Sequence, residues 1–497
     1  MIPEAPATAA ARAADSTSAP GPERCPGGSI VGGFLPVGAE TLSPAGIESG
    51  RVSALATRER QRYRDEHPVS ARLAREACAH LPGGVPMHWM SDWGLAFPLF
   101  LDAAAGAQLR DADGRDYADF CLGDTGAMFG HAPQPVAAML RARAGFGYTT
   151  MLPGADAIAV AGNLAQRFGL PYWQFATTAS DANRFLLRVA RAVTGRRKIL
   201  VFDGCYHGAV DETLVRLGPD GASRPRPGQL GPAFDCAAHT VVVGFDDPDG
   251  LDAALAGGDI AVVLTEPALT NAGLVLPQPG FHAHLRAATR RHGTLLAIDE
   301  THTISAGPGG CTRAWGLAPD FVTLGKPLAG GLPAAAWGLS AGVERALAGV
   351  RQPVADGHSG LGTTLSAGAL TLAVVRANLE EVMTDAAYAR MFALAGQLQH
   401  GLERLIGRYR LPWCVVRLGA RQELVFRPQP PRSAAESLAA ADPALERLLH
   451  LYWLNRGVLV TPFHNMLLLS PEHREADLER LLDVLDAALG ELTGAAS

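Results

Sequence analysis

Aromatic residues and surplus positive charge are both scarce in this chain of 497 residues. Phe, Trp and Tyr together make up 6% of it, and 43 lysines and arginines stand against 49 aspartates and glutamates, which gives a formal net charge of −6. Proteins that bind nucleic acids usually carry a basic face, and those that bind single strands add aromatic side chains on which bases stack. We therefore expect no nucleic-acid partner.

Cysteines are few and scattered. The seven lie at positions 25, 78, 121, 205, 236, 311 and 414, and no two have the CxxC spacing of a zinc site or a redox pair. We expect neither a metal site nor a disulfide framework, and a reducing compartment suits the chain best.

Long apolar segments are missing as well. No uncharged apolar stretch reaches the roughly 18 residues of a membrane-spanning helix. The first residues, Met-Ile-Pro-Glu-Ala-Pro-Ala-Thr, lack the basic region and apolar core of a secretory signal. We expect no membrane partner and a cytoplasmic location.

Composition and periodicity divide the chain into four parts. Residues 1–50 are rich in Ala, Pro, Gly and Ser, which predicts a disordered extension. Residues 51–125 read as an N-terminal segment, with helix over about 55–80 and then a small antiparallel meander. Residues 126–385 are expected to form a large domain. Residues 386–497 are expected to form a small C-terminal domain with strand-like alternation and a closing helix.

Six short apolar runs alternate with helical segments in the expected large domain. They are residues 198–202, 240–244, 260–264, 294–298, 320–324 and 334–339. Strands that are apolar on both faces and separated by helices predict an α/β fold with a mostly parallel sheet covered by helices.

Four of these runs end in chemically useful groups. They lead to the segment from Asp203 to Gly208, to Glu266, to Asp299 and to Lys326. In such sheets ligands bind beyond the carboxyl ends of the strands. A lysine that forms a Schiff base and an aspartate that pairs with a pyridinium nitrogen are what pyridoxal 5′-phosphate (PLP) requires. Lys326 alone could be an exposed lysine in a Gly-rich turn, but four such endings in a row favour a site.

Small residues open a predicted helix upstream of these strands. A phosphate would suit the free N–H groups at the start of this helix, where the helix dipole also favours an anion. The alternative is a plain N-cap by Thr178, Ser180 or Asp181, which needs no ligand.

Five segments, in this order, resemble the class III (fold-type I) PLP-dependent aminotransferases, and within them the glutamate-1-semialdehyde aminomutase-like branch. They are Thr178-Ala179-Ser180-Asp181-Ala182-Asn183, Gly204-Cys205-Tyr206-His207-Gly208, Glu266-Pro267 with Asn271 and Gly273, Asp299-Glu300-Thr301-His302-Thr303, and Gly325-Lys326-Pro327-Leu328-Ala329-Gly330-Gly331-Leu332-Pro333. The resemblance covers about residues 75–490. It implies a fold-type I transferase: a mostly parallel, seven-stranded-type sheet that binds PLP, and a smaller α+β domain formed by the N-terminal segment and the C-terminal region.

The resemblance also implies roles for single residues. Lys326 would form the Schiff base and then move a proton, and Asp299 would keep the ring nitrogen protonated. Tyr206 would stack on the ring, and His207 would either orient Tyr206 or simply be packed. The cofactor-binding residues would be Ala179, Ser180, Tyr206, His207, Glu266, Asn271, Asp299, His302, Lys326 and Thr364.

Thr364 enters because the segment 357–366 resembles a family loop whose threonine completes the phosphate site of the partner subunit. Ungapped alignment favours Thr364, and the Gly-Thr pair favours Thr363. The resemblance therefore implies a homodimer with shared active sites. An ordinary Thr-rich turn is the alternative.

Three positions depart from the family pattern. Ala179 stands where glycine is usual, which requires that the backbone there have no positive φ. Thr301 replaces a valine expected to pack under the ring. His302 takes a position often held by glutamine or methionine, where its imidazole would reach the phenolic oxygen. Together they suggest a subfamily with its own substrate.

The substrate side departs further. Met90 falls where the aminomutases carry a carboxylate-binding arginine, and a thioether cannot form that charged pair. Trp89 and Trp93 suit an apolar or cationic group, and core packing is the alternative for both. Arg417 or Arg421, expected on one face of a strand, would hold any carboxylate, and a surface ion pair is the alternative. On this basis we expect that the enzyme is not a glutamate-1-semialdehyde aminomutase.

The leading hypothesis is a PLP-dependent aminotransferase that moves an amino group from an amine or amino acid to a keto or aldehyde acceptor. An aminomutase, which moves the group within one molecule, is the nearest alternative. Decarboxylation or cyclisation is a third, and a catalytically silent PLP-binding protein is a fourth.

Overall fold

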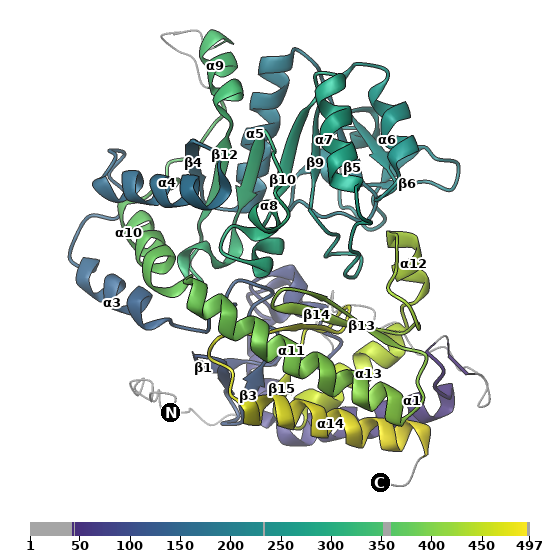
Figure 1. The fold of residues 1–497 in the computed structure, drawn as a ribbon. Helices are drawn as coiled ribbons and strands as arrows, with labels where there is room; N and C mark the ends of the chain where they lie inside the picture. Colours follow the sequence, from purple (N-terminus) through teal and green to yellow (C-terminus); the bar gives the residue numbers. More distant parts are fainter. Residues whose placement is uncertain (1–41, 44, 232–233, 351–358, 495–497) are drawn as a thin grey trace.

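The chain forms a large α/β domain and a smaller domain in which segments from both ends of the chain meet (Figure 1). The computed structural model describes residues 42–43, 45–231, 234–350 and 359–494. No helix within these ranges is both long and apolar enough to cross a membrane.

Seven strands form the central sheet of the large domain, in the order β4-β12-β11-β10-β9-β5-β8. β12 runs antiparallel to both of its neighbours, and the other pairs are parallel. The strands are β4 (Tyr172–Ala176), β5 (Lys198–Phe202), β8 (Thr240–Val243), β9 (Ile260–Thr265), β10 (Leu295–Asp299), β11 (Phe321–Leu324) and β12 (Ala335–Leu339). All six predicted runs are strands, and the mostly parallel sheet is confirmed.

Several helices cover this sheet because they present apolar faces to it. α5 (Ala179–Thr194) buries Phe185, Leu186 and Val189 while crossing β4, β12, β11 and β9, and Gly195 ends it in a left-handed conformation. The other helices of this domain are α3 (Gln134–Arg143), α4 (Ala155–Phe168), α6 (Pro248–Leu255), α7 (Phe281–Arg291), α8 (Gly310–Ala314), α9 (Ala341–Val350) and α10 (Ala369–Ala377). A short hairpin, β6 (Val215–Leu217) and β7 (Ser223–Pro225), leaves the sheet after β5.

Two small sheets form the other domain. One has the order β1-β2-β3-β15, so that a C-terminal strand pairs with the N-terminal meander, and the other has the order β13-β14-β16. The strands are β1 (Leu101–Ala105), β2 (Gln108–Asp111), β3 (Asp116–Asp119), β13 (Cys414–Leu418), β14 (Arg421–Val425), β15 (Val458–Leu459) and β16 (Met466–Leu468). The expected α+β domain built from both ends of the chain is present.

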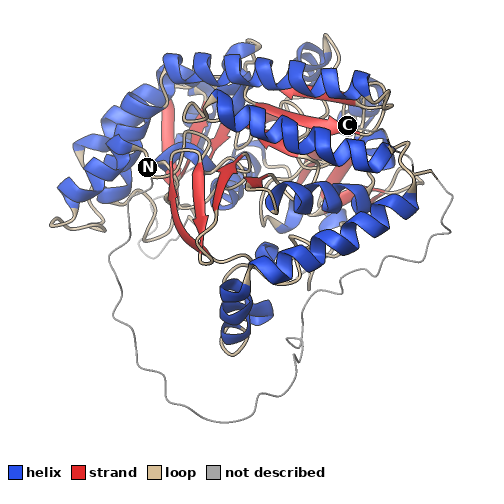
Figure 2. Ribbon diagram, turned by 90° about the horizontal axis from the view of Figure 1, so that it is seen from below, coloured by secondary structure: helices blue, strands red, loops and turns tan. Residues whose placement is uncertain are grey.

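Helices lie beside these strands, as Figure 2 shows from below. They are α1 (Ser49–Glu66), α2 (Pro68–Ala77), α11 (Asp385–Arg408), α13 (Pro443–Leu454) and α14 (Glu475–Thr493). The short helix α12 (Ala434–Ala439) reaches toward the large domain, where Ala434 lies close to Gly204. α1 packs against α13 and α14, which lie almost four hundred residues further along the chain.

The structure corrects several predicted boundaries. The helix expected over 55–80 is two helices, because Pro68 disfavours helical geometry at His67, whose φ is −128°. Residues 1–41 of the predicted extension lie outside the described residues, but Ala45 and Ile47 are buried and Ser49 already begins α1. The stretch 413–426 is a hairpin of two strands that turns at Gly419, whose φ is +59°.

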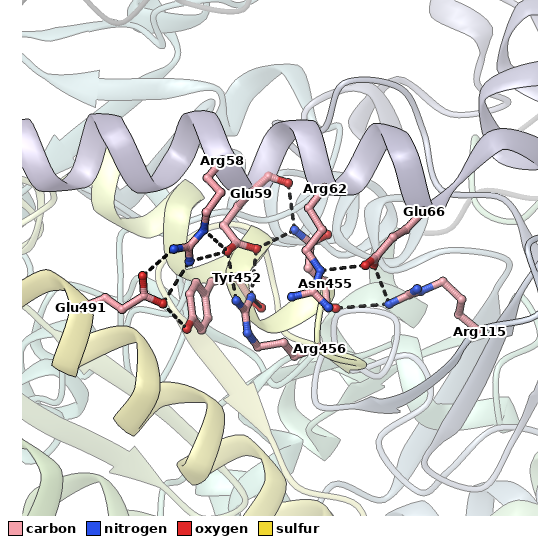
Figure 3. A network of polar contacts seen from close by, with 9 residues as sticks. All are labelled: Arg58, Glu59, Arg62, Glu66, Arg115, Tyr452, Asn455, Arg456 and Glu491. Atoms are coloured by element: carbon pink, nitrogen blue, oxygen red, sulfur yellow. Dashed lines mark hydrogen bonds and ion pairs between the residues drawn. The ribbon is translucent and has the colours of Figure 1, made fainter. Parts of the chain in front are cut away.

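A buried carboxylate links α1 to the residues that directly follow α13 (Figure 3). Glu59 is fully buried and accepts hydrogen bonds from Arg456 Nη1 at 2.9 Å, Asn455 Nδ2 at 2.8 Å and Arg58 Nη2 at 2.9 Å. Arg58 also reaches Glu491 of α14. A buried charge with so many donors is compensated, so it holds the two ends of the chain together.

Candidate active site

The carboxyl ends of β9, β10 and β11 place three predicted residues at one edge of the large sheet. Asp299 is the last residue of β10 and pairs in register with Thr323 of β11, and Lys326 follows β11 directly. Glu266 comes after β9. They line a cavity of about 350 Å³ together with Trp89, Thr177, Thr178, Ala179, Ser180, Tyr206, His207, Gly208, Thr301, His302, Gly331, Leu332, Pro333 and Ala334.

Lys326 is one of only two lysines in the chain. The other, Lys198, pairs with Asp259 at 2.8 Å at the surface. Lys326 lies instead in the cavity wall, with Nζ 2.6 Å from Asp124 Oδ2 and 2.7 Å from His302 Nε2. This scarcity was an available signal in the sequence, because a chain with two lysines offers few amines for covalent chemistry.

Asp299 is buried and receives four hydrogen bonds. Asn183 Nδ2 and His207 Nδ1 donate to Oδ2 at 2.9 Å and 3.0 Å, and Thr301 donates to Oδ1 through its N–H at 3.1 Å and its hydroxyl at 2.6 Å. Burial opposes ionisation, but these bonds lower the pKa of Asp299 below its ordinary value. The carboxylate therefore stays charged, as pairing with a protonated ring nitrogen requires.

One of these contacts corrects an expectation from the sequence, and another gives a role to a residue that departs from the family pattern. His207 contacts Asp299, so it is neither a partner of Tyr206 nor merely packed. Thr301, which replaces an expected valine, uses its hydroxyl to hold the same carboxylate.

The N-terminus of α5 forms a cradle suited to an anion. Thr178 caps the helix by accepting from Asp181 N at 3.1 Å, which leaves the first N–H groups, at Ala179 and Ser180, without an acceptor inside the helix. Both the N-cap and the free N–H groups expected from the sequence are thus present. Ala179 has a helical backbone, so a residue other than glycine is tolerated there.

Two glycines allow neighbouring loops to lie close against this cradle. Gly208 has a φ of +84°, and a Cβ built on it would overlap Ser180 Oγ. Gly325, just before Lys326, comes so close that an added Cβ would lie 2.9 Å from Ala179 Cβ. The loops after β5 and β11 therefore meet the start of α5 with no room for larger side chains.

Glu266 and Asn271 lie on the Tyr206 side of the site. Glu266 accepts from Tyr206 N at 3.2 Å and from the Thr270 hydroxyl, and burial raises its pKa to about 6. Asn271 accepts from Arg226 Nη2 at 2.9 Å, and the Arg226 guanidinium lies 5.6 Å from the centre of the Tyr206 ring. Arg226, from the segment after β7, was not singled out from the sequence.

His302 lies beside Lys326, and the expectation that its imidazole would reach the phenolic oxygen of PLP stays a prediction. Its Nε2 contacts Lys326, and its Nδ1 lies 3.1 Å from Thr125 Oγ1. Burial, reinforced by the charge of Lys326, lowers the pKa of His302 to about 3, so the imidazole is neutral. Asp124 and Thr125 were missed in the sequence, since they follow none of the six apolar runs of the large domain and match none of the five motifs.

The expected substrate residues are only partly brought together. The Trp89 ring lies 6.0 Å from the Tyr206 ring and lines the cavity. Trp93 packs edge-on against His450 at 5.7 Å, in an apolar cluster of the small domain. Thr363 and Thr364 lie in an exposed turn, where the Thr363 hydroxyl contacts Ser366 Oγ at 3.0 Å.

Arg417 and Arg421 do not share a face, contrary to expectation. The chain turns between them, and the register pairs Arg417 with Gln422 and Leu418 with Arg421, so the two arginines point to opposite sides. Arg417 is exposed and donates to Gln399 at 2.7 Å. Arg421 is 2% exposed, pairs with Glu423 at 2.6 Å and directs Nη1 toward His302 Nδ1 at 3.4 Å.

Comparison with known proteins agrees with this geometry. The family described as Aminotransferase class-III matches residues 89–489. The chain belongs to the class III aminotransferase family. Family membership brings PLP as the cofactor, and the residues fit it: an anion cradle at α5, a charged Asp299 for the ring nitrogen and an amine at Lys326.

Named relatives point to one branch of the family. The chain is 35% identical to the glutamate-1-semialdehyde 2,1-aminomutase of Sorangium cellulosum (strain So ce56) over 433 residues, which are 86% of this chain and 97% of the relative. It superposes on a crystal structure of a glutamate-1-semialdehyde-aminomutase from Pseudomonas aeruginosa PAO1 with a TM-score of 0.88 and 49% identity, covering 90% of this chain and 100% of that one. An omega-transaminase from Sphaerobacter thermophilus gives a TM-score of 0.79 and 27% identity, covering 86% and 99%.

Proposed function

We propose that this protein is a PLP-dependent aminomutase, which moves an amino group between two carbons of one small molecule. The observation that carries the proposal is the presence of Lys326 and Asp299 at one edge of the sheet, in a chain whose similarity to enzymes named glutamate-1-semialdehyde 2,1-aminomutase spans more than four-fifths of its length. The sequence alone favoured an aminotransferase, with the aminomutase as alternative. The relatives support the alternative better.

Each residue has a definite task in this proposal. Bound PLP supplies an electron-withdrawing ring, which stabilises negative charge at the carbon that carries the amino group. Asp299 would keep the ring nitrogen positively charged, and the N–H groups at Ala179 and Ser180 would bind the phosphate. The amine of Lys326 would hold and move the proton taken from the substrate carbon, and Tyr206 would pack against the ring.

No arginine is among the described residues that line the cavity, and Lys326 is the one lysine among them. Met90, exposed beside Trp89, has no charge with which to bind a carboxylate. The exclusion of glutamate 1-semialdehyde rested on Met90 alone. It stays a prediction, and the names of the relatives weigh against it.

A single-substrate experiment tests the proposal. The PLP-loaded enzyme is incubated with glutamate 1-semialdehyde, and separately with other small amino aldehydes and amino ketones, with no acceptor added. An aminomutase turns over many equivalents of one substrate, because each cycle returns the cofactor to its starting form. Conversion that stops after about one equivalent per site for every compound would reject the proposal.

The second candidate is intermolecular amino transfer. It is favoured by Met90, which departs from the aminomutase pattern, and by the similarity to an omega-transaminase. Its signature is a half-reaction with one amine that stops, followed by turnover once a keto or aldehyde acceptor is added. The same samples thus distinguish the two candidates.

A further inference from the structure

The turn after β3 has an unusual backbone. Leu122, Gly123, Asp124 and Thr125 have φ values of +47°, +57°, +50° and +82°, so four successive residues occupy the left-handed region and only one is glycine. Such conformations are costly for residues with a Cβ, and they persist only where the surroundings impose them. Asp119 Oδ1 holds the start of the turn by accepting from Cys121 N at 2.8 Å and Leu122 N at 2.9 Å.

This turn directs two consecutive side chains at the catalytic amine and its neighbour. Asp124 Oδ2 lies 2.6 Å from Lys326 Nζ. Thr125 Oγ1 lies 3.1 Å from His302 Nδ1, and His302 Nε2 lies 2.7 Å from the same Nζ. The amine is therefore held on two sides by one strained turn, once directly and once through an imidazole.

Of the side chains in contact with Lys326 Nζ, Asp124 is the one that balances its positive charge. Of the two side chains that contact Nζ, His302 is neutral, so Asp124 supplies the negative charge. Burial opposes ionisation of Asp124, but the nearby Lys326 lowers its pKa to about 2. Arg421 of β14 faces His302, but the charge of Arg421 is already neutralised by Glu423. His464 lies beside this arginine–glutamate pair. Asp299 and Tyr206 face the group from β10 and from the loop after β5.

We propose that Asp124 is a positioning residue for Lys326, whose carboxylate holds Nζ in the cavity and balances its positive charge both when the amine is free and when it is bound to the cofactor. The inference rests on the proposed PLP function. It explains why the strained turn is kept: a relaxed backbone at residues 122–125 would turn Asp124 and Thr125 away from Lys326 and His302.

The test uses full-length protein loaded with PLP, as wild type, Asp124→Asn, Asp124→Glu and the control Asp116→Asn. Asp116 lies in β3 of the same segment, where it is exposed and pairs with Arg110 at 2.8 Å. The visible absorption of the lysine-bound cofactor is titrated against pH without substrate. Losing a carboxylate in contact with a cationic nitrogen makes that nitrogen more acidic, so we expect the midpoint in Asp124→Asn to fall by about 1 to 3 pH units. In Asp124→Glu the midpoint is expected to return part of the way to the wild-type value. In Asp116→Asn it is expected to equal the wild-type value.

Turnover gives a second readout. We expect kcat of Asp124→Asn to fall by about 10- to 100-fold with KM nearly unchanged, because proton handling by Lys326 is impaired while the substrate contacts remain. A wild-type midpoint and kcat in Asp124→Asn would overturn the role of Asp124. If Asp124→Asn folds poorly, the titration is made on the fraction that is folded. An unshifted midpoint in that fraction, with a wild-type midpoint in Asp124→Glu, would also overturn the role of Asp124. If the wild type itself gives no visible absorption with PLP, the proposed function fails first, and this inference fails with it.

Discussion

Asp299 and Lys326 reach the site from neighbouring parallel strands that end at the same edge of the sheet. Asp299 is the register partner of Thr323, and only Leu324 and Gly325 separate that residue from the lysine. The distance between the anion for the ring nitrogen and the amine is thus set by two adjacent strands rather than by flexible loops, which is how a site is held to narrow tolerances.

The first prediction concerns the amine itself. Lys326→Ala is expected to abolish the visible absorption of the lysine-bound cofactor and multiple turnover while the fold remains. Lys198→Ala, the other lysine, is the matched control and is expected to keep both. After borohydride reduction of the wild type, peptide mass analysis should find the cofactor on the peptide that contains Lys326. A label on Lys198 would contradict the assignment.

The second prediction concerns the carboxylate at the ring nitrogen. Asp299→Asn is expected to retain weakened PLP binding and to lose about 10²- to 10³-fold in kcat, on the order of removing one preorganised electrostatic group. Thr301→Val removes a single hydroxyl donor to Asp299, so about a 5-fold loss is expected, equivalent to ~1 kcal/mol. Equal activity of Asp299→Asn and wild type would argue against the pairing.

The two arginines of the β13–β14 hairpin give opposite expectations. Arg417→Ala is expected to leave KM within about 2-fold, since this exposed side chain points away from the cavity. Arg421→Ala is expected to cost about 3 to 5 kcal/mol of stability, because it leaves Glu423 buried without its cation. The paired change Arg421→Met with Glu423→Gln should recover much of that loss, as measured by urea unfolding. If this double variant has the wild-type KM, Arg421 does not bind the substrate.

The fourth prediction concerns the buried carboxylate of α1. Glu59→Gln is expected to destabilise the protein by about 3 kcal/mol, toward the low end for breaking a buried ion pair because Arg58 and Arg456 reach solvent. Glu76→Gln, which breaks an exposed pair with Arg72, should cost less than about 1 kcal/mol. Chemical unfolding at neutral pH compares the two.

The same carboxylate predicts a pH dependence. Burial opposes ionisation, but Arg456, Asn455 and Arg58 lower the pKa of Glu59 from its ordinary 4.5 to about 2. Because the folded pKa lies below the unfolded one, the stabilisation is fully present above pH 4.5 and is lost as the pH falls toward 2. The stability difference between wild type and Glu59→Gln should therefore shrink over that interval. A difference that stays constant would contradict the assignment.

The fifth prediction is a homodimer. The turn with Thr363 and Thr364 lies beside exposed apolar side chains, and Tyr148 O lies only 3.2 Å from a Cβ built on Gly368. The exposed apolar residues are Phe146, Tyr148, Met151, Leu152 and Leu365. Apolar patches of this kind often mark interfaces. Light scattering should give a dimer for the wild type, a shift toward monomer for Leu152→Glu, and no shift for Leu230→Glu, an exposed leucine elsewhere. An active wild-type monomer would reject the shared site.

The fold was largely predictable because buried parallel strands leave a strong pattern. Six strands were apolar runs, whereas β4 was missed: it lies at the edge of the sheet, and Tyr172 and Gln174 face solvent, so its sequence is not continuously apolar. Lys326 and Asp299 could be found because each follows such a run. Asp124 could not, because its place depends on a left-handed turn for which the sequence gives no glycine signal beyond Gly123. The same holds for Arg421, whose facing was misjudged because a hairpin turn was taken as continuous strand.

Glu59 and Arg456 lie 397 residues apart in the chain and in direct contact in the fold. During synthesis α1 leaves the ribosome long before the residues that neutralise its buried carboxylate are made. Local contacts form quickly, and such distant ones wait for the intervening chain. The large domain, by contrast, has its whole sheet available once β12 has been made. We therefore expect the small domain to be completed after the large one, and α1 to expose an apolar face to aggregation or proteolysis until then.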